Sequence, residues 1–152
     1  MKSSLLALLL CLTLLLFVDL VSAQKSAAPD KAYLQQIWDG WSTLNPDNVA
    51  TFYASGPHTF FDIAPLKYAS WDEYQKGVRQ EVADYTSAKF TVNDDAALHP
   101  EGSSVWGTAT VNFEMTHKNG KVDTGNMRWT VIFAKQGGKW RIVHEHVSVP
   151  MQ

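Results

Sequence analysis

Gly138-Lys139-Trp140-Arg141-Ile142-Val143-His144-Glu145-His146-Val147-Ser148 is the most informative segment of this chain, because it has the pattern of a β-strand that follows a glycine turn. Successive side chains of a strand point to opposite faces. Strict alternation therefore places both imidazoles of this segment on one face, together with Trp140 and Ile142. It places Glu145 on the reverse face with Val147. Polar groups at these positions predict either satisfied core residues or the lining of a site.

The two segments before it complete an antiparallel meander. Residues 105–117 and 121–135 both alternate between apolar and polar side chains. Asn119-Gly120 separates them, and both residues tolerate the positive φ of a tight hairpin turn. Gly137-Gly138 forms the next turn. A further strand is expected over residues 89–98, with an irregularity at Asp94-Asp95.

Helices are expected in the first half of the chain. Asp30 is a candidate N-cap ahead of apolar residues at helical spacing up to Leu44. Asn45-Pro46 predicts a second, short helix. Ser70-Trp71-Asp72-Glu73 is a capping box, which predicts a third helix from Trp71 to about Tyr85. With a strand over residues 58–64, this order predicts an α+β fold whose N-terminal helices pack on one face of a curved, mostly antiparallel sheet.

The chain begins with the pattern of a secretory signal peptide. Lys2 precedes an apolar run over residues 5–18, and Val21-Ser22-Ala23 is a small-residue cleavage site. We therefore expect residues 1–23 to be removed, residues 24–29 to form a flexible leader and residues 30–150 to form one domain. The expected location is periplasmic or extracellular, with no membrane association after cleavage. A lipoprotein anchor at Cys11 is the weaker alternative, because Leu10 stands where a small residue is required.

Composition narrows the classes of function. The net charge is −2 and no basic cluster occurs, so nucleic acid is not an expected partner. The only cysteine lies within the signal peptide, which excludes disulfide and thiol chemistry from the processed chain. No phosphate-binding loop or nucleophile elbow is present, and no cofactor is expected.

Taken together, the helix pair, the capped helix and the closing strand resemble the SnoaL-like branch of the nuclear transport factor-like superfamily, which includes ketosteroid isomerase. The segment Asp62-Ile63-Ala64-Pro65-Leu66-Lys67-Tyr68 with Trp71, Glu73 and Tyr74 resembles secreted bacterial members. The resemblance covers residues 30–149. It implies a cone-shaped fold with a pocket between sheet and helices, and a homodimer. It does not by itself assign an activity, because the family contains isomerases and dehydratases as well as non-enzymatic members.

Asp62 is the leading catalytic candidate. It lies within Phe60-Phe61-Asp62-Ile63-Ala64, and apolar neighbours raise the pKa of a carboxyl and suit it to acid/base work. The alternative is a structural carboxylate that caps a turn or pairs with Lys67. His146 is the second candidate proton carrier. Tyr68 is a candidate donor to a substrate oxygen.

Arg128 is a candidate for stabilising negative charge. Ideal two-residue turns at Asn119-Gly120 and Gly137-Gly138 place Arg128 opposite Val147 and diagonal to Glu145. A one-residue bulge at the glycine turn would place Arg128 with His146 instead. The structural alternative is an Arg128–Glu145 ion pair.

The remaining candidates concern ligands. His144 and His146 have a spacing that can chelate zinc, but no other histidine is placed to complete such a site, so no metal is expected. We expect aromatic side chains and Glu145 to contact a small apolar molecule, with Trp41, Tyr53, Tyr68 and Trp129 as the named contacts. Three functions remain open, namely a cofactor-independent isomerase or dehydratase, a non-catalytic binder of small molecules, and an oligomerisation module.

Overall fold

Polar caps begin both α-helices of the described residues, as the sequence predicts. In the computed structural model, which describes residues 27–151, Asp30 accepts a hydrogen bond from the Tyr33 N–H and starts helix α2 (Lys31–Trp41). Ser70 accepts from the Glu73 N–H and starts helix α3 (Trp71–Glu81). The predicted signal peptide and residues 24–26 of the predicted leader lie outside the described residues.

Several predicted boundaries are wrong. The helix expected at Asn45-Pro46 consists of two 3₁₀ turns, η2 (Pro46–Asn48) and η3 (Ala50–Phe52). Helix α3 ends before Val82, and a third 3₁₀ turn, η4 (Val82–Asp84), follows it. The strand expected over residues 58–64 contains only β1 (Phe60–Phe61). The strand expected over residues 89–98 divides into β2 (Tyr85–Val92) and β3 (Ala97–Glu101) at the predicted irregularity.

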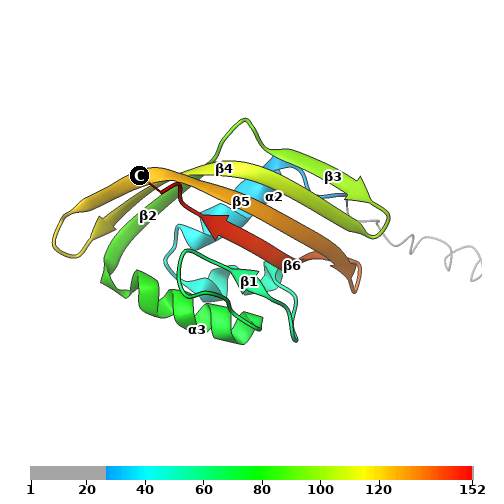
Figure 1. Ribbon diagram of the computed structural model, residues 1–152, viewed down its shortest axis with the longest axis horizontal. Helices are drawn as coiled ribbons and strands as arrows, with labels where there is room; N and C mark the ends of the chain where they lie inside the picture. Colours follow the sequence, from blue (N-terminus) through cyan, green and yellow to red (C-terminus); the bar gives the residue numbers. More distant parts are fainter. Residues whose placement is uncertain (1–26, 152) are drawn as a thin grey trace, which may run out of the picture.

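The expected antiparallel meander is confirmed. Strands β4 (Ser104–His117), β5 (Val122–Gln136) and β6 (Lys139–Ser148) pair in sequence. The sheet order is β1-β6-β5-β4-β2, and β3 also pairs with β4. β1 is the one parallel neighbour among these strands. Figure 1 shows the curved sheet on one side, with α2 crossing behind it and α3 lying near β1.

The β4–β5 register differs from the predicted one by one residue. Val111 pairs with Met127, not with Arg128. Asn119-Gly120 belongs to a three-residue loop, in which the His117 N–H donates to the Lys121 carbonyl and Gly120 adopts a φ of 84°. This is the hairpin with a type I turn and a glycine bulge, so the positive φ falls only on the glycine.

A bulge inside β6 changes the faces that strict alternation predicts. Phe133 pairs with Ile142, whereas Ile132 pairs with His144, so Val143 is the extra residue. Beyond this point the side-chain directions are inverted relative to the start of the strand. Glu145 therefore faces the core beside Val131, and His144 and His146 face outwards. The predicted face shared by Ile142 and the two histidines is wrong.

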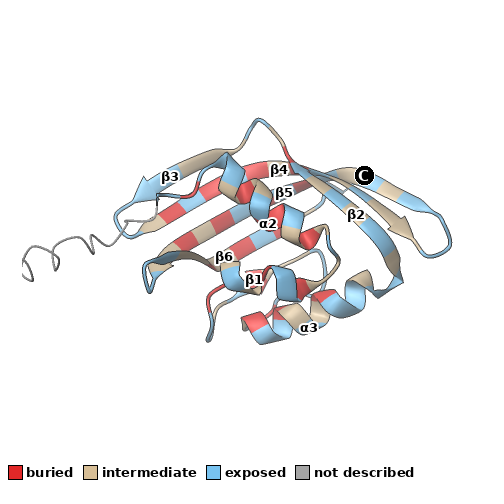
Figure 2. Cartoon of the chain, turned by 180° about the vertical axis from the view of Figure 1, so that it is seen from behind, coloured by how far each residue is buried: buried red, intermediate tan, exposed pale blue. Residues whose placement is uncertain are grey.

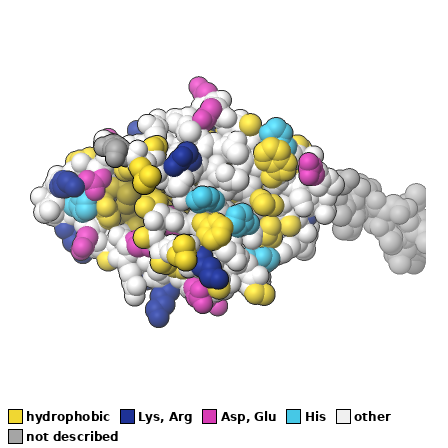
Figure 3. Space-filling model, in the orientation of Figure 1, with side chains coloured by type: hydrophobic (Ala, Val, Ile, Leu, Met, Phe, Trp, Pro, Cys, Tyr) yellow, Lys and Arg dark blue, Asp and Glu magenta, His cyan; other side chains and the backbone are white. Residues whose placement is uncertain are grey.

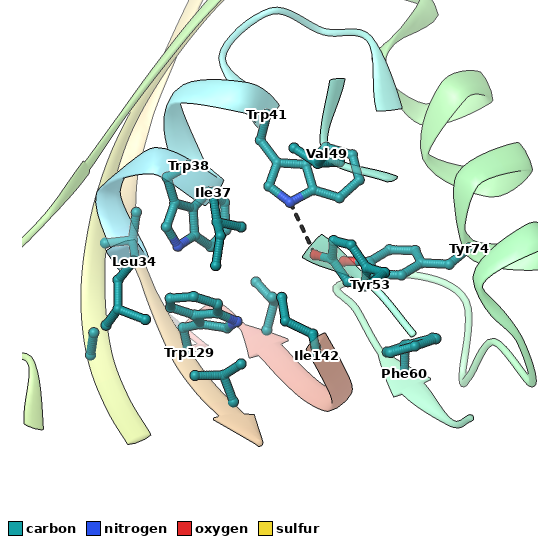
Figure 4. Packing of buried hydrophobic residues seen from close by; sticks show 14 of the residues in the cluster. Leu34, Ile37, Trp38, Trp41, Val49, Tyr53, Phe60, Tyr74, Trp129 and Ile142 are labelled. Atoms are coloured by element: carbon teal, nitrogen blue, oxygen red, sulfur yellow. Dashed lines mark hydrogen bonds between the residues drawn. The ribbon is translucent and has the colours of Figure 1, made fainter. Parts of the chain in front are cut away.

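The core lies between α2 and the inner face of the sheet. Figure 2 shows the buried positions of β4, β5 and β6 on the side that carries α2. Leu34, Ile37 and Trp38 from the helix meet Trp129 and Phe133 from β5. Figure 4 shows this packing from close by, and the Trp38 and Trp129 rings make an edge contact with centroids 5.4 Å apart.

Candidate functional site

Asp62 follows β1 directly, and its position comes from that strand. Phe60 pairs with Glu145 of β6, and its main chain also exchanges two hydrogen bonds of 2.9 Å with Tyr68. Phe60 is fully buried. Because residues two apart in an extended chain point to the same side, Asp62 is directed inwards as Phe60 is. One Asp62 carboxylate oxygen accepts a 2.7 Å hydrogen bond from the Ile63 N–H.

Asp62 lies in the wall of a cavity of about 280 Å³ between α2, α3 and the sheet. This volume is at the small end of the range for ligand pockets, which favours a small ligand. Most of the wall is aromatic or aliphatic, and the polar side chains in it belong to Asp62, Tyr74, Glu81 and Tyr85. The other lining residues are Trp38, Trp41, Ile63, Ala64, Val78, Val82, Phe90, Met115, Met127 and Val147.

The surroundings of Asp62 raise the pKa of its carboxyl to about 7. Burial is the largest cause, because it disfavours the charged form. The negative charges of Glu145 and Glu81 raise the pKa further, while hydrogen bonds from the Ile63 N–H and the Tyr74 hydroxyl lower it. A carboxyl with a pKa near neutrality can both accept and donate a proton at physiological pH.

Glu145 is the one charged side chain that is fully buried among residues 27–151. The Tyr53 hydroxyl donates to one carboxylate oxygen at 2.7 Å, and Trp129 Nε1 donates to the other at 2.8 Å. Tyr53 in turn accepts a hydrogen bond from Trp41 Nε1 at 3.1 Å, which is the dashed line in Figure 4. Burial raises the pKa of Glu145, and the hydrogen bonds from Tyr53, Trp129 and Tyr74 oppose this.

Tyr74 connects Glu145 to the cavity. Its hydroxyl is close enough to Asp62 and Glu145 to lower the pKa of each carboxyl, and its single proton can be donated to only one of them at a time. Burial and the two negative charges raise the pKa of Tyr74 well above its usual value, so its hydroxyl remains a donor. The path Glu145–Tyr74–Asp62 therefore joins a buried carboxyl to the carboxyl in the cavity wall.

Tyr68 and Glu81 form a second polar pair next to the cavity. The Tyr68 hydroxyl donates to Glu81 Oε1 at 2.7 Å, and Glu81 lines the cavity. Gly77 makes this contact possible, because a Cβ at this position would lie 2.2 Å from the Tyr68 hydroxyl oxygen. Tyr68 thus reaches the site through Glu81, and it is not itself part of the cavity wall.

The structure does not bring all the predicted site residues together. Asp62 and Trp41 line the cavity, whereas Tyr53, Trp129 and Glu145 form the buried network behind it. Tyr68 lies beside Glu81.

Arg128 and His146 lie elsewhere, on the outer face of the sheet. Arg128 is exposed, pairs with Ser148 in the sheet, and donates from Nη2 to the Val149 carbonyl at 3.0 Å. The predicted placement of Arg128 opposite Val147 and near Glu145 is wrong, and the cause is the two register shifts described above. The alternative placement with His146 agrees with the register, because Arg128 pairs with Ser148 and Thr130 with His146, although the extra residue is Val143 and does not lie at the glycine turn.

The histidine pair belongs to the outer face as well. His144 Nδ1 lies 2.8 Å from the Thr59 carbonyl, and the rings of His144 and His146 both make edge contacts with Phe61. Figure 3 shows histidines beside hydrophobic side chains on this face. Within residues 27–151, no group of three His, Cys, Asp or Glu side chains could hold a metal ion.

Sequence reasoning missed Tyr74, Glu81 and Tyr85 as lining residues. A signal for two of them was present. Tyr74, Val78 and Glu81 have the spacing of one helix face, so a carboxylate at position 81 continues an otherwise apolar stripe.

None of the helices in residues 27–151 is long and apolar enough to span a bilayer.

Comparison with known proteins identifies the fold independently. A nuclear transport factor 2-like superfamily protein from Salmonella enterica superposes with a TM-score of 0.73 at 16% identity, over 80% of this chain and 89% of that one. A candidate calcium/calmodulin-dependent protein kinase II association domain from Xanthomonas campestris gives 0.69 at 23% identity, over 84% and 95%. A candidate dehydratase of the NTF2-like family from Streptomyces avermitilis gives 0.70 at 11% identity, over 80% and 95%.

At these identities the solved structures show a shared fold and nothing finer. A search of curated proteins finds no match. The family model named SnoaL-like domain matches residues 31–152, which is the greater part of the chain and contains both α-helices and all six strands of the described residues. This chain therefore belongs to the SnoaL-like domain family, within the nuclear transport factor 2-like fold.

Proposed function

We propose that this protein is a cofactor-independent acid/base enzyme, of the isomerase or dehydratase type, that acts on a small molecule with an apolar body. The observation that carries the proposal is Asp62, an ionisable carboxyl with a pKa near 7 in the wall of a mostly apolar cavity. Such an environment is costly for a carboxylate and suits proton transfer at neutral pH. The candidate dehydratase among the solved structures is consistent with this class of chemistry.

In this proposal Asp62 takes a proton from carbon or oxygen of the substrate and returns it at another position. Tyr74 donates a hydrogen bond and holds the Asp62 carboxyl in place. Glu145 acts through Tyr74 and is a positioning residue, because it is buried behind the cavity wall. Arg128 and His146 have no part in the step, since both lie on the outer face.

Deuterium exchange tests proton abstraction without knowledge of the natural substrate. The protein is incubated in D₂O with a panel of small cyclic and aryl ketones, and mass spectrometry follows the incorporation of deuterium next to the carbonyl. We expect the protein to accelerate exchange for at least one ketone, and Asp62→Asn to lose at least 100-fold of that acceleration. Asp39→Asn is the matched control, because Asp39 lies on the exposed side of α2.

The non-catalytic binder is the competing function. It predicts that ketones bind without exchange, and that Asp62→Asn leaves their affinity unchanged. The oligomerisation module predicts neither binding nor exchange. A wide exposed tryptophan surface would favour it, but of the tryptophans in residues 27–151 only Trp106 is as much as 38% exposed, and its ring is stacked on His99.

A further inference from the structure

The charge of the cavity indicates which ligands it can accept. Two ionisable acids, Asp62 and Glu81, are in its wall, and Glu145 lies behind Tyr74. Among residues 27–151, no lysine, arginine or histidine lines the cavity. The four ion pairs in this part of the chain involve other carboxylates, namely those of Asp47, Asp94 and Asp123. The three acids therefore have no cationic partner in the described structure.

The aromatic part of the wall has the same preference. Trp38, Trp41, Tyr74, Tyr85 and Phe90 line the cavity. The faces of aromatic rings are electronegative, and they attract ammonium groups most strongly where water is excluded. An anionic ligand would meet both the carboxylates and the ring faces, and would be repelled by each.

Trp38 contributes its ring, and no hydrogen-bond donor, to the cavity wall. The residue is only 6% exposed, and its Nε1 has no hydrogen-bond partner within the described part of the chain. That nitrogen has almost no accessible surface, so it faces the packed side chains and not the cavity. An ammonium cation would also offer it no acceptor. The other indole in the wall, Trp41, already donates to Tyr53.

We propose that the ligand of this cavity is a small organic cation, an amine or quaternary ammonium compound with an apolar or aromatic body. Its charged group would lie between Asp62 and Glu81, and its body would contact the aromatic wall. This inference rests on the proposed function in that it uses the same cavity, and it adds the charge of the substrate. It makes no claim about the chemical step.

Binding should depend on pH through Asp62. The groups that face this carboxyl are Tyr74 and Glu81 from α3 and Glu145 from β6. With its pKa at about 7, Asp62 is mainly neutral at pH 5.5 and mainly charged at pH 8.5. A bound cation favours the charged form, so its affinity rises between these two pH values.

Two compounds of the same shape test the proposal. Benzyltrimethylammonium carries a permanent positive charge, and neopentylbenzene is its neutral isostere. Ligand-observed NMR gives both dissociation constants for the full processed protein at pH 5.5 and 8.5, with phenylacetate as an anionic probe. We expect the cation to bind at least tenfold more tightly than the isostere at pH 8.5, and this ratio to fall at least fivefold at pH 5.5. Phenylacetate should not bind.

Two variants test whether the preference for the cation over its isostere comes from the cavity. Glu81→Gln keeps an acceptor for the Tyr68 hydroxyl and removes one charge, so we expect it to lower the cation-to-isostere ratio at least fivefold. Glu101→Gln is the matched control, because Glu101 is exposed at the β3–β4 turn and its loss should leave the ratio unchanged. Both dissociation constants are measured on the same sample of each variant. Misfolded protein therefore lowers the apparent binding of both compounds equally and leaves their ratio unchanged.

Three results would overturn the inference: equal or tighter binding of the isostere, binding of neither compound, or a ratio that Glu81→Gln leaves unchanged. Tighter binding of the isostere would leave the proposed acid/base function intact. Conversely, a strong preference for the cation together with no deuterium exchange, also for an aryl ketone that carries a trimethylammonium group, would overturn the acid/base function and keep the cation site.

Discussion

The ionised carboxylate of Asp62 lowers the stability of the folded protein, because it is buried. Its carboxyl has an ordinary pKa of 3.8 in the unfolded chain and about 7 in the folded protein. The folded state therefore binds the proton more tightly, and the ionised carboxylate is the less stable form in the native protein. The sequence indicated this property correctly, because the apolar neighbours of Asp62 predict desolvation.

Asp62→Asn should consequently make the stability less dependent on pH. The wild-type protein loses stability from this group as the pH rises from about 4 to about 7, and the asparagine variant does not. We expect the two proteins to be similar at pH 4 and the variant to be more stable at pH 8.5, by at most about 4 kcal/mol. Urea unfolding at both pH values measures this, with Asp39→Asn as control. A variant that is less stable than wild type at pH 8.5 would contradict the burial cost.

Glu145 differs from Asp62 in that side-chain donors bind both of its carboxylate oxygens, although burial raises its pKa as well. Glu145→Gln keeps the volume but places an amide where two oxygens accept hydrogen bonds. Tyr53 can rotate its hydroxyl proton, whereas Trp129 Nε1 can only donate. We expect a loss of about 1–3 kcal/mol in urea unfolding, and a lower Asp62 pKa in a carboxyl NMR titration because one like charge is gone. Glu114→Gln on the exposed face of β4 should change neither quantity.

At the scale of elements, two small irregularities determine which side chains meet. The glycine bulge in the β4–β5 hairpin shifts Arg128 by one position, and the bulge at Val143 inverts the second half of β6. Either shift moves a set of side chains from one face of the sheet to the other. Helix α3 has a comparable feature in Gly77, where the chain must approach another side chain closely.

Gly77→Ala tests that approach. In the interior of an exposed helix this change usually stabilises a protein by up to about 1 kcal/mol. Here the new methyl would lie 2.2 Å from the Tyr68 hydroxyl oxygen and 2.4 Å from Cε1, so the Tyr68 ring must leave Glu81. We expect a net loss of about 1–3 kcal/mol in thermal or urea unfolding.

A second background shows the cause of this loss. In Tyr68→Ala the ring is absent, and Gly77→Ala should then be neutral or stabilising. A loss of the same size in both backgrounds would mean that the contact with Tyr68 is not the reason for the glycine.

At the scale of the whole molecule, one face of the sheet is covered and the other is open. Helix α2 and the 3₁₀ turns cover the inner face, while Phe61, Trp106 and the histidine pair lie on the outer face. The excess of large apolar side chains over what one helical layer covers favours a homodimer.

We expect the processed protein to be a homodimer at micromolar concentration. Multi-angle light scattering coupled to size exclusion should give twice the subunit mass. A monomer mass at all concentrations up to the millimolar range would contradict this prediction.

Export remains a prediction from the first 23 residues. Protein isolated from its own host should begin at Gln24 and should be found outside the cytoplasm. Amino-terminal sequencing of the fractionated protein measures both points. A protein that retains Met1 in the cytoplasmic fraction would show that residues 1–23 are not a signal peptide.

Local patterns were sufficient for the elements of this fold. The caps at Asp30 and Ser70, the alternation in the three long strands and the glycine turns all act over a few residues, and each predicted its element. Local patterns did not predict which face of the sheet each side chain occupies, because this depends on the sum of single-residue shifts along paired strands. Alternation alone placed Glu145 on the wrong side of Trp129 and next to Arg128. Packing instead put Glu145 next to one indole and one tyrosine, whose hydrogen bonds compensate its burial, and left Arg128 in solvent, where a guanidinium is hydrated.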